Sequence, residues 1–146
     1  MEIARILKIW AITETLLDLL QKIQNRAGRV ILKVNPFSHT STFQVHDTLK
    51  WDYLDTRQKR HLQIMVYKVV NDLCPEYMKE KLQVKRTNYC LRAQGQLNLP
   101  KPQTNSCKRT FFYRGSDLYN SLPNSVRNAE SLRTFNSLLG QFRGWE

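Results

Sequence analysis

The chain has 146 residues, 41% of them hydrophobic and 24% charged, which is the composition of a single globular domain. These values exclude collagen, a fully disordered tail and a membrane bundle. The unusual number is the net charge of +11, from 23 Lys and Arg against 12 Asp and Glu. Such an excess favours a polyanionic partner, namely RNA, DNA or an anionic membrane surface.

Residues 2–34 have the pattern of one long amphipathic helix. Apolar residues recur mostly at three- or four-residue steps and share one face: Ile3, Leu7, Trp10, Leu17, Leu20, Ile23, Ala27, Val30 and Val34. Gly28 weakens this helix by about 1 kcal/mol relative to Ala, and Asn35-Pro36 ends it. We interpret the apolar stripe as core; a partner helix or a membrane surface are the other two interpretations.

Residues 35–82 are expected to form a helical core. After a polar loop, a short helix is predicted over 43–50, and Asp52 or Asp55 is placed to cap a longer helix over 55–73. Five apolar residues of that helix share a face: Leu62, Met65, Val66, Val69 and Leu73. Pro75 ends it and begins a short helix that reaches Leu82.

Residues 83–113 lack a helical period and contain Gly95, Pro100 and Pro102, so we predict an extended linker with a short strand or two. Residues 114–146 form the C-terminal helical segment, with helical turns at 115–122 and after Pro123. Ser131 caps a last helix over 131–142. The predicted fold is mostly α, a small helical domain with a long N-terminal amphipathic helix and an extended basic linker.

Most of the excess charge lies in one segment. Residues 81–114 have a net charge of +8 with no acidic residue, whereas 1–35 have +3 and the rest of the chain is balanced. The basic residues are Lys81, Lys85, Arg86, Arg92, Lys101, Lys108, Arg109 and Arg114. A bound polyanion relieves the repulsion among them and gains counterion release. We therefore predict a nucleic-acid contact here; a merely solvated basic loop is the alternative.

Aromatic residues accompany this charge. Tyr89 lies within the segment, and Phe111, Phe112 and Tyr113 stand just before Arg114. Stacking of an unpaired base on such a ring is worth about 1–3 kcal/mol. We expect one of the two phenylalanines to anchor the segment in the core, and we include Tyr113 among the predicted nucleic-acid contacts.

The three cysteines, Cys74, Cys90 and Cys107, are odd in number and far apart. They predict a reducing compartment, nuclear or cytoplasmic, and a protein that is not secreted. Glu14 and Asp18 interrupt the apolar N-terminal stretch, so neither a signal peptide nor a membrane span is expected.

The sequence lacks the usual local signs of catalysis. It has no Gly-rich phosphate loop, no nucleophile elbow and no paired zinc ligands, so we predict no metal, no cofactor, no small-molecule substrate and no enzymatic activity. Asp47, Asp52 and Asp55 lie near His46 and Lys50, which leaves a metal-dependent nuclease as a remote alternative.

A series of short motifs nevertheless occurs in a specific order. It runs through Gln24-Asn25-Arg26-Ala27-Gly28-Arg29-Val30-Ile31, Ser38-His39-Thr40-Ser41, Leu49-Lys50-Trp51 with Leu54 and Arg57, Tyr67-Lys68, Asn71, Pro75-Glu76-Tyr77, Leu91-Arg92, Leu99-Pro100-Lys101-Pro102, Lys108-Arg109-Thr110-Phe111, Tyr113-Arg114-Gly115, Asn120-Ser121-Leu122-Pro123, Ser131-Leu132 and Phe135. The ordered set resembles the region that follows the polymerase domain in non-LTR (LINE-type, jockey-like) retrotransposon reverse transcriptases.

This resemblance implies an accessory role. The Tyr/Phe-x-Asp-Asp motif with which the family's polymerase holds magnesium does not occur in the chain, so the resemblance implies a non-catalytic C-terminal fragment without its polymerase domain. It implies RNA or target DNA as partners, and the missing polymerase domain as another. The alternative is a structural packing module without nucleic-acid contacts, in which Trp51, Tyr119, Leu122 and Phe135 are packing residues.

Overall fold

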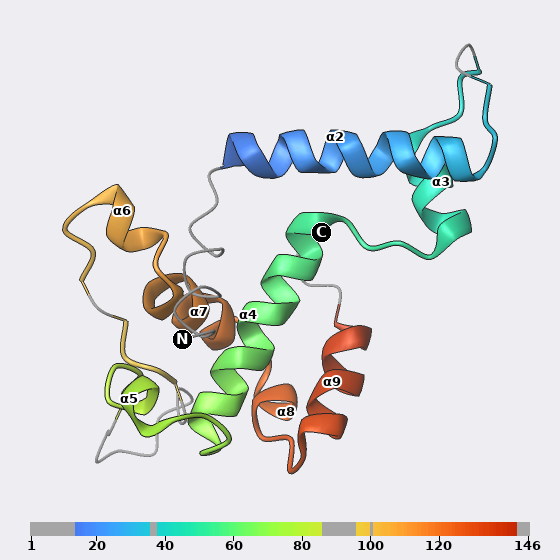
Figure 1. Ribbon diagram of the computed structural model, residues 1–146. Coiled ribbons are helices and arrows are strands. Elements are labelled where there is room, and N and C mark those ends of the chain that lie inside the picture. Colours follow the sequence, from blue (N-terminus) through green and yellow to red (C-terminus); the bar gives the residue numbers. More distant parts are fainter. Residues whose placement is uncertain (1–13, 36–37, 86–95, 100, 143–146) are drawn as a thin grey trace. The chain divides into compact units, whose positions relative to one another are not determined.

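The computed structural model describes residues 14–35, 38–85, 96–99 and 101–142, and these are mostly helical (Figure 1). The predicted mostly α fold class is thereby confirmed. The chain divides into two compact units, one spanning Ile12–Gln58 and the other beginning at Lys59. We call them the N-terminal unit and the C-terminal unit, and each is described by itself.

The N-terminal unit contains helices α2 (Glu14–Ile31) and α3 (Thr42–Leu49) and the start of α4 (Leu54–Val70). The hydroxyl of Ser41 accepts a hydrogen bond from the Gln44 amide, and the Gln44 side chain accepts one from the Ser41 amide, which makes a capping box for α3. Lys50 ends α3 in the left-handed conformation, with a φ of 53°. The short helix predicted over 43–50 is thus confirmed, one residue earlier at each end.

The ends of two other predicted elements differ. The first part of the predicted helix 2–34 lies outside the described residues, and α2 ends at Ile31, before Lys33 with its φ of 51°. Helix α4 begins at Leu54, with Asp52 two residues before it and Asp55 in its first turn. The amide of Leu54 donates to the side-chain oxygen of Gln21 at 2.8 Å, so a residue of α2 contributes to the start of α4.

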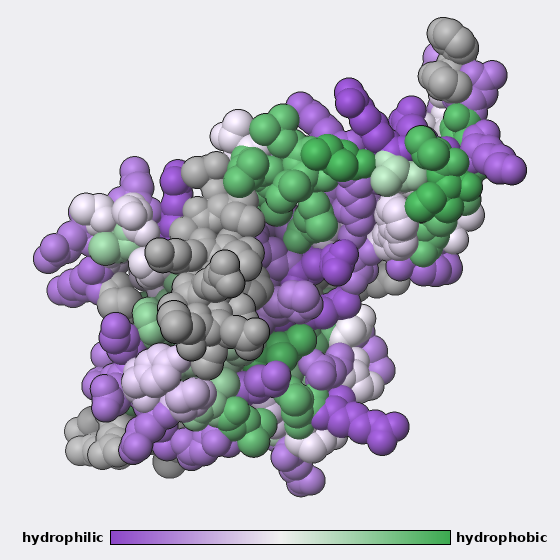
Figure 2. Space-filling view, viewed as in Figure 1, coloured by the Kyte–Doolittle hydropathy of each residue, from purple (hydrophilic) through white to green (hydrophobic). Residues whose placement is uncertain are grey.

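The apolar stripe of α2 is exposed, so the prediction that it is core is wrong for the described part of the helix. Of the predicted stripe, Leu20, Ile23 and Val30 have between 40% and 76% of their surface exposed and Leu17 is half-buried; Leu16, Leu19 and Ile31 beside them are also exposed. Figure 2 shows hydrophobic side chains gathered along this helix. The opposite side packs instead. Gly28 is buried, and a Cβ there would lie 2.7 Å from Val45 Cγ1 of α3.

The interior of the N-terminal unit is polar around His46, which is 2% exposed. One ring nitrogen of His46 lies 2.7 Å from Asn25 Oδ1, and the other lies 3.3 Å from the carbonyl oxygen of Trp51. Its ring also stacks on Tyr53, with centroids 4.5 Å apart. The polar face of α2 therefore packs inside the unit, half-buried, because its amide side chains have partners on α3 and at the start of α4.

The C-terminal unit contains the rest of α4 and five further helices. They are α5 (Glu76–Lys79), α6 (Asn105–Lys108), α7 (Phe111–Asn120), α8 (Asn124–Arg127) and α9 (Leu132–Gln141). One apolar cluster joins all of these helices except α6: Leu62, Val66, Tyr67, Val69, Met78, Leu82, Leu97, Phe111, Tyr119, Leu122, Val126, Phe135 and Leu139. Ser131 caps α9 by accepting from the Thr134 amide at 3.1 Å, as predicted.

The centre of this core is aromatic. The Tyr67 and Phe135 rings are stacked with centroids 4.2 Å apart, and the Tyr67 hydroxyl donates to the Ala129 carbonyl at 2.7 Å. Tyr119 is 2% exposed, and burial raises the pKa of its phenol. Three of the four residues named for the packing alternative, Tyr119, Leu122 and Phe135, are thus buried, and the fourth, Trp51, is half-buried.

The predicted extended linker over 83–113 is corrected in its second half. It contains α6 and the start of α7, which begins at Phe111 and not at 115. Gly115 is interior to α7, where a Cβ would lie 2.9 Å from Val66 Cγ2, so this glycine lets α7 approach α4 closely. Leu73 is 57% exposed and does not share the buried face of α4.

Candidate nucleic-acid interface

The basic segment 81–114 is attached to the core of the C-terminal unit at several points. Leu82 and Leu97 are buried, and an antiparallel bridge joins Val84 to Leu97. The amide of Lys85 donates to the Gln96 carbonyl at 2.8 Å, and the amide of Asn98 donates to the Gln83 carbonyl at 2.7 Å. Residues 83–85 and 96–98 of the segment therefore lie side by side.

Asn120 of α7 holds the backbone of Leu97, on one side of this bridge. Its Oδ1 accepts from the Leu97 amide at 2.8 Å, and its Nδ2 donates to the Leu97 carbonyl at 3.0 Å. One side chain thus satisfies both backbone groups of a fully buried residue, as a neighbouring strand would. Asn120 belongs to one of the sequence motifs, but nothing in its spacing indicated this partner.

Two threonines organise the rest of the segment. Thr104 caps α6 by accepting from the Cys107 amide at 3.2 Å. Thr110 caps α7, and its hydroxyl also donates to the Cys107 carbonyl at 2.7 Å. Lys108 and Arg109 lie between these two caps, and both side chains are exposed. Their backbone is therefore fixed while their charges face solvent.

The predicted contact residues fall into three groups. Five are exposed: Lys81, Lys85, Lys101, Lys108 and Arg109. Arg114 and Tyr113 are half-buried in α7, so they present less surface than predicted. Arg86 and Arg92 lie outside the described residues.

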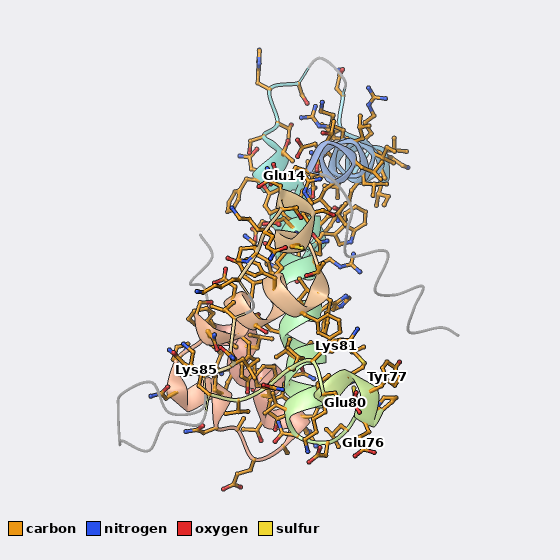
Figure 3. All side chains as sticks on the ribbon, turned by 90° about the vertical axis from the view of Figure 1, so that its left-hand side faces the viewer. Glu14, Glu76, Tyr77, Glu80, Lys81 and Lys85 are labelled. Atoms are coloured by element: carbon orange, nitrogen blue, oxygen red, sulfur yellow. The ribbon has the colours of Figure 1, made fainter. Side chains whose placement is uncertain are left out.

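Lys81 connects two parts of the segment. Its Nζ lies 5.4 Å from the centroid of the Phe112 ring, a cation–π contact between the chain after α5 and the first turn of α7. Figure 3 shows Lys81 and Lys85, with Glu76 and Tyr77 of α5 and the next residue after that helix, Glu80, below Lys81. Two acidic residues, Glu76 and Glu80, therefore border the basic segment on this side.

The exposed cations of the segment are not neutralised within the described part of the chain. The side chains of Lys85, Lys101, Lys108 and Arg109 form no ion pair with a carboxylate there. Phe111 is buried and Phe112 packs partly against the core, which agrees with the expectation that one phenylalanine anchors the segment. In its described part the exposed chemistry of the segment is consequently cationic rather than aromatic, which suits phosphate contacts; Tyr89 lies outside the described residues.

The acidic residues near His46 do not assemble a metal site. Asp47 pairs with Lys50 at 3.1 Å, and both ring nitrogens of the buried His46 have other partners. Among the residues with described positions, no three His, Cys, Asp or Glu side chains are grouped so as to hold a metal ion. No described helix combines the length and hydropathy that crossing a bilayer requires.

Comparison of the chain with protein families, with curated proteins and with solved structures finds no match.

Proposed function

We propose that this chain is a non-catalytic accessory region of a LINE-type retrotransposon reverse transcriptase that holds RNA or target DNA through residues 81–114. One observation carries the proposal. Five exposed cations stand on a segment with no acidic residue; in its described part, Asn120 anchors the backbone at Leu97 and two threonine caps fix the backbone around Lys108 and Arg109. Such cations contact phosphates, which position a nucleic acid without reading its sequence.

The held parts of this backbone favour the function over a solvated basic loop. Like charges on the anchored and capped stretches cannot move apart freely to relieve their repulsion, so a bound polyanion lowers the free energy of the folded state. A fixed scaffold also loses little conformational entropy when it binds. The proposed function places the protein in the nucleus or cytoplasm, where its free thiols, such as the exposed Cys107, remain reduced.

Replacing Lys85, Lys101, Lys108 and Arg109 together by Ala is expected to weaken binding to RNA, single-stranded DNA and duplex DNA. Each phosphate contact contributes about −0.9 to the slope of log affinity against log salt on duplex DNA, so four lost contacts flatten that slope by about 3–4. Fluorescence anisotropy across a salt series measures both the affinity and the slope, and the preferred ligand distinguishes template from target.

The matched control replaces four exposed cations outside the segment, Lys22, Arg26, Lys79 and Arg133, by Ala. Each variant removes four charges from +11 and leaves +7, so the two differ in where the charge is lost. We expect the control to keep most of the wild-type slope. Equal slopes for the two variants, or no binding by the wild type, would contradict the proposal.

A second candidate function is supported by α2. This helix packs its polar side, with Gln21 and Asn25, inside the N-terminal unit and leaves its apolar side exposed. Contiguous exposed apolar surface commonly marks a site of protein–protein contact. Under this alternative, α2 docks on the polymerase domain and the chain is a packing module with no nucleic-acid contact of its own.

Replacing Ile23 and Val30 by Glu is expected to lower the binding of the dye ANS to the isolated chain, because both residues lie in the exposed apolar stripe. The thermal midpoint should change little, since neither side chain packs in the core. Dye fluorescence and a melting curve measure the two effects. A strongly lowered midpoint would show that the stripe is covered within the chain, which contradicts docking on a partner.

A further inference from the structure

An open pocket of about 540 Å³ lies within the N-terminal unit. Its lining residues come from α2, the end of α3 and the first turns of α4: Gln24, Lys50, Trp51, Asp52, Leu54 and Arg57. Its volume is in the range of pockets that hold small ligands, about 300–1,000 Å³. Five of these six residues belong to two of the ordered sequence motifs, which the fold brings together at one place.

The aromatic wall of this pocket is held rigidly. The indole of Trp51 is half-buried and meets the His46 ring edge to face, with centroids 6.4 Å apart at an angle of 82°. On the α2 side, a Cβ at Gly28 would lie 3.5 Å from Trp51 Cζ3, an ordinary contact distance, so the indole lies close against this helix. A fixed, partly exposed indole is a platform on which a nucleobase stacks with little loss of entropy.

Two cations line the same pocket. Lys50 contacts Asp47 at 3.1 Å, but the side chains are 81% and 64% exposed, and such a surface pair is weak enough to be exchanged for a phosphate. Arg57 is exposed, and its side chain has no partner among the described residues. Both cations are therefore able to contact an anion that enters the pocket.

The charge balance indicates which anion fits. Asp52 is the one acidic residue in the lining, so the pocket has a formal charge of +1. That matches a phosphodiester, which has a single negative charge, better than a nucleoside triphosphate. The base of a single strand is free to stack on an indole, whereas a base inside a duplex is already stacked and paired.

We infer that this pocket holds one nucleotide of a single-stranded nucleic acid, with the base against Trp51 and the phosphodiester at Lys50 and Arg57. The inference rests on the proposed function, because it assumes that the chain binds nucleic acid. It adds a site outside the basic segment that distinguishes single strands from duplexes.

The test measures anisotropy of dye-labelled ten-nucleotide dT and U strands, and of a duplex of equal length. Trp51→Leu is expected to weaken single-strand binding about tenfold or more, as removal of a stacking ring does, and to leave duplex binding within about twofold. Arg57→Gln removes an exposed cation without touching the core, so it remains informative if Trp51→Leu fails to fold. It should weaken single-strand binding by several-fold.

The chain offers matched controls for both changes. Tyr77→Leu removes another aromatic residue, 52% exposed. Lys79→Gln is the control for Lys50→Gln. It breaks the exposed ion pair between Lys79 and Asp72, which resembles the pair that Lys50 makes with Asp47. If the Trp51, Lys50 and Arg57 variants fold and bind single strands within twofold of the wild-type affinity, the inferred nucleotide site is wrong, and the proposed function of the basic segment is unaffected. A wild type that binds no nucleic acid overturns the proposed function and this inference with it.

Discussion

Replacing Phe135 by Ala is expected to lower the free energy of unfolding of the C-terminal unit by about 3–5 kcal/mol, the cost of removing a buried aromatic ring and leaving a cavity. Phe135 is fully buried and stacks on Tyr67 at 4.2 Å, with Tyr119 on the same cluster at 6.5 Å. Domains of this size are stable by about 5–15 kcal/mol, so the loss is a large part of the total. Urea unfolding followed by circular dichroism measures it.

The control for this change is Phe43→Ala, because Phe43 is 69% exposed on α3. Its cost should stay within about 0.5 kcal/mol, as for most surface substitutions. Phe135→Leu keeps most of the buried volume and should fall between the two. Similar unfolding midpoints for Phe135→Ala and Phe43→Ala would be inconsistent with a central position for Phe135.

Replacing Asn120 by Leu is expected to destabilise the C-terminal unit by about 2–4 kcal/mol, because it leaves two buried backbone groups of Leu97 unpaired at about 1–3 kcal/mol each. The bridge to Val84 cannot replace them, since the bonds of that bridge are made by the residues on either side of Leu97. Thermal unfolding measures the loss, and hydrogen exchange at the Leu97 amide locates it.

Asn98→Leu is the matched control, since Asn98 is exposed and its amide, not its side chain, takes part in the bridge. That substitution should change the midpoint little. Rapid hydrogen exchange at the Leu97 amide already in the wild type would contradict the two hydrogen bonds from Asn120, which we call the Asn120 clamp. If the clamp holds, Asn120→Leu should also weaken nucleic-acid binding, because the basic segment loses an anchor and becomes more mobile.

Helix boundaries set by neighbouring residues could be predicted from the sequence. Ser131 caps α9 as expected, and α8 begins directly after Pro123. These signals succeed because a cap or a proline acts on the backbone within a few residues. The prediction of a helical turn from 115 is too late, although Thr110 supplies a local cap for α7. Gly115 lies inside this helix because it contacts Val66 of α4, and no local pattern reports such a contact.

The periodicity of α2 predicted a helix and its apolar face but not which face is covered. Hydrophobic spacing alone makes an apolar stripe the natural candidate for core. The structure covers the other side because Gln21 and Asn25 have hydrogen-bond partners on distant residues, Leu54 and His46. Side-chain amides of this kind look like solvent-exposed residues in a sequence.

For the basic interface too, the local features could be predicted from the sequence and the long-range contacts could not. Its charge and the absence of acidic residues could be counted from the sequence, and five of the predicted cations are exposed. Its attachment to the core depends on Asn120 and Leu97, which are 23 residues apart. The pocket at Trp51 joins α2 to the start of α4 in the same way, so spacing alone could not predict it.

The hydrogen bond that the Leu54 amide donates to the Gln21 side chain has a consequence for how the N-terminal unit folds. Its two residues are 33 positions apart, so the first turn of α4 gains this partner only after the intervening loop has closed. Helix nucleation is already unfavourable, and a start that depends on a remote side chain delays it further. Docking of α2 and completion of α4 should therefore occur in one cooperative step, and a chain shortened past Gln21 should fray at Leu54.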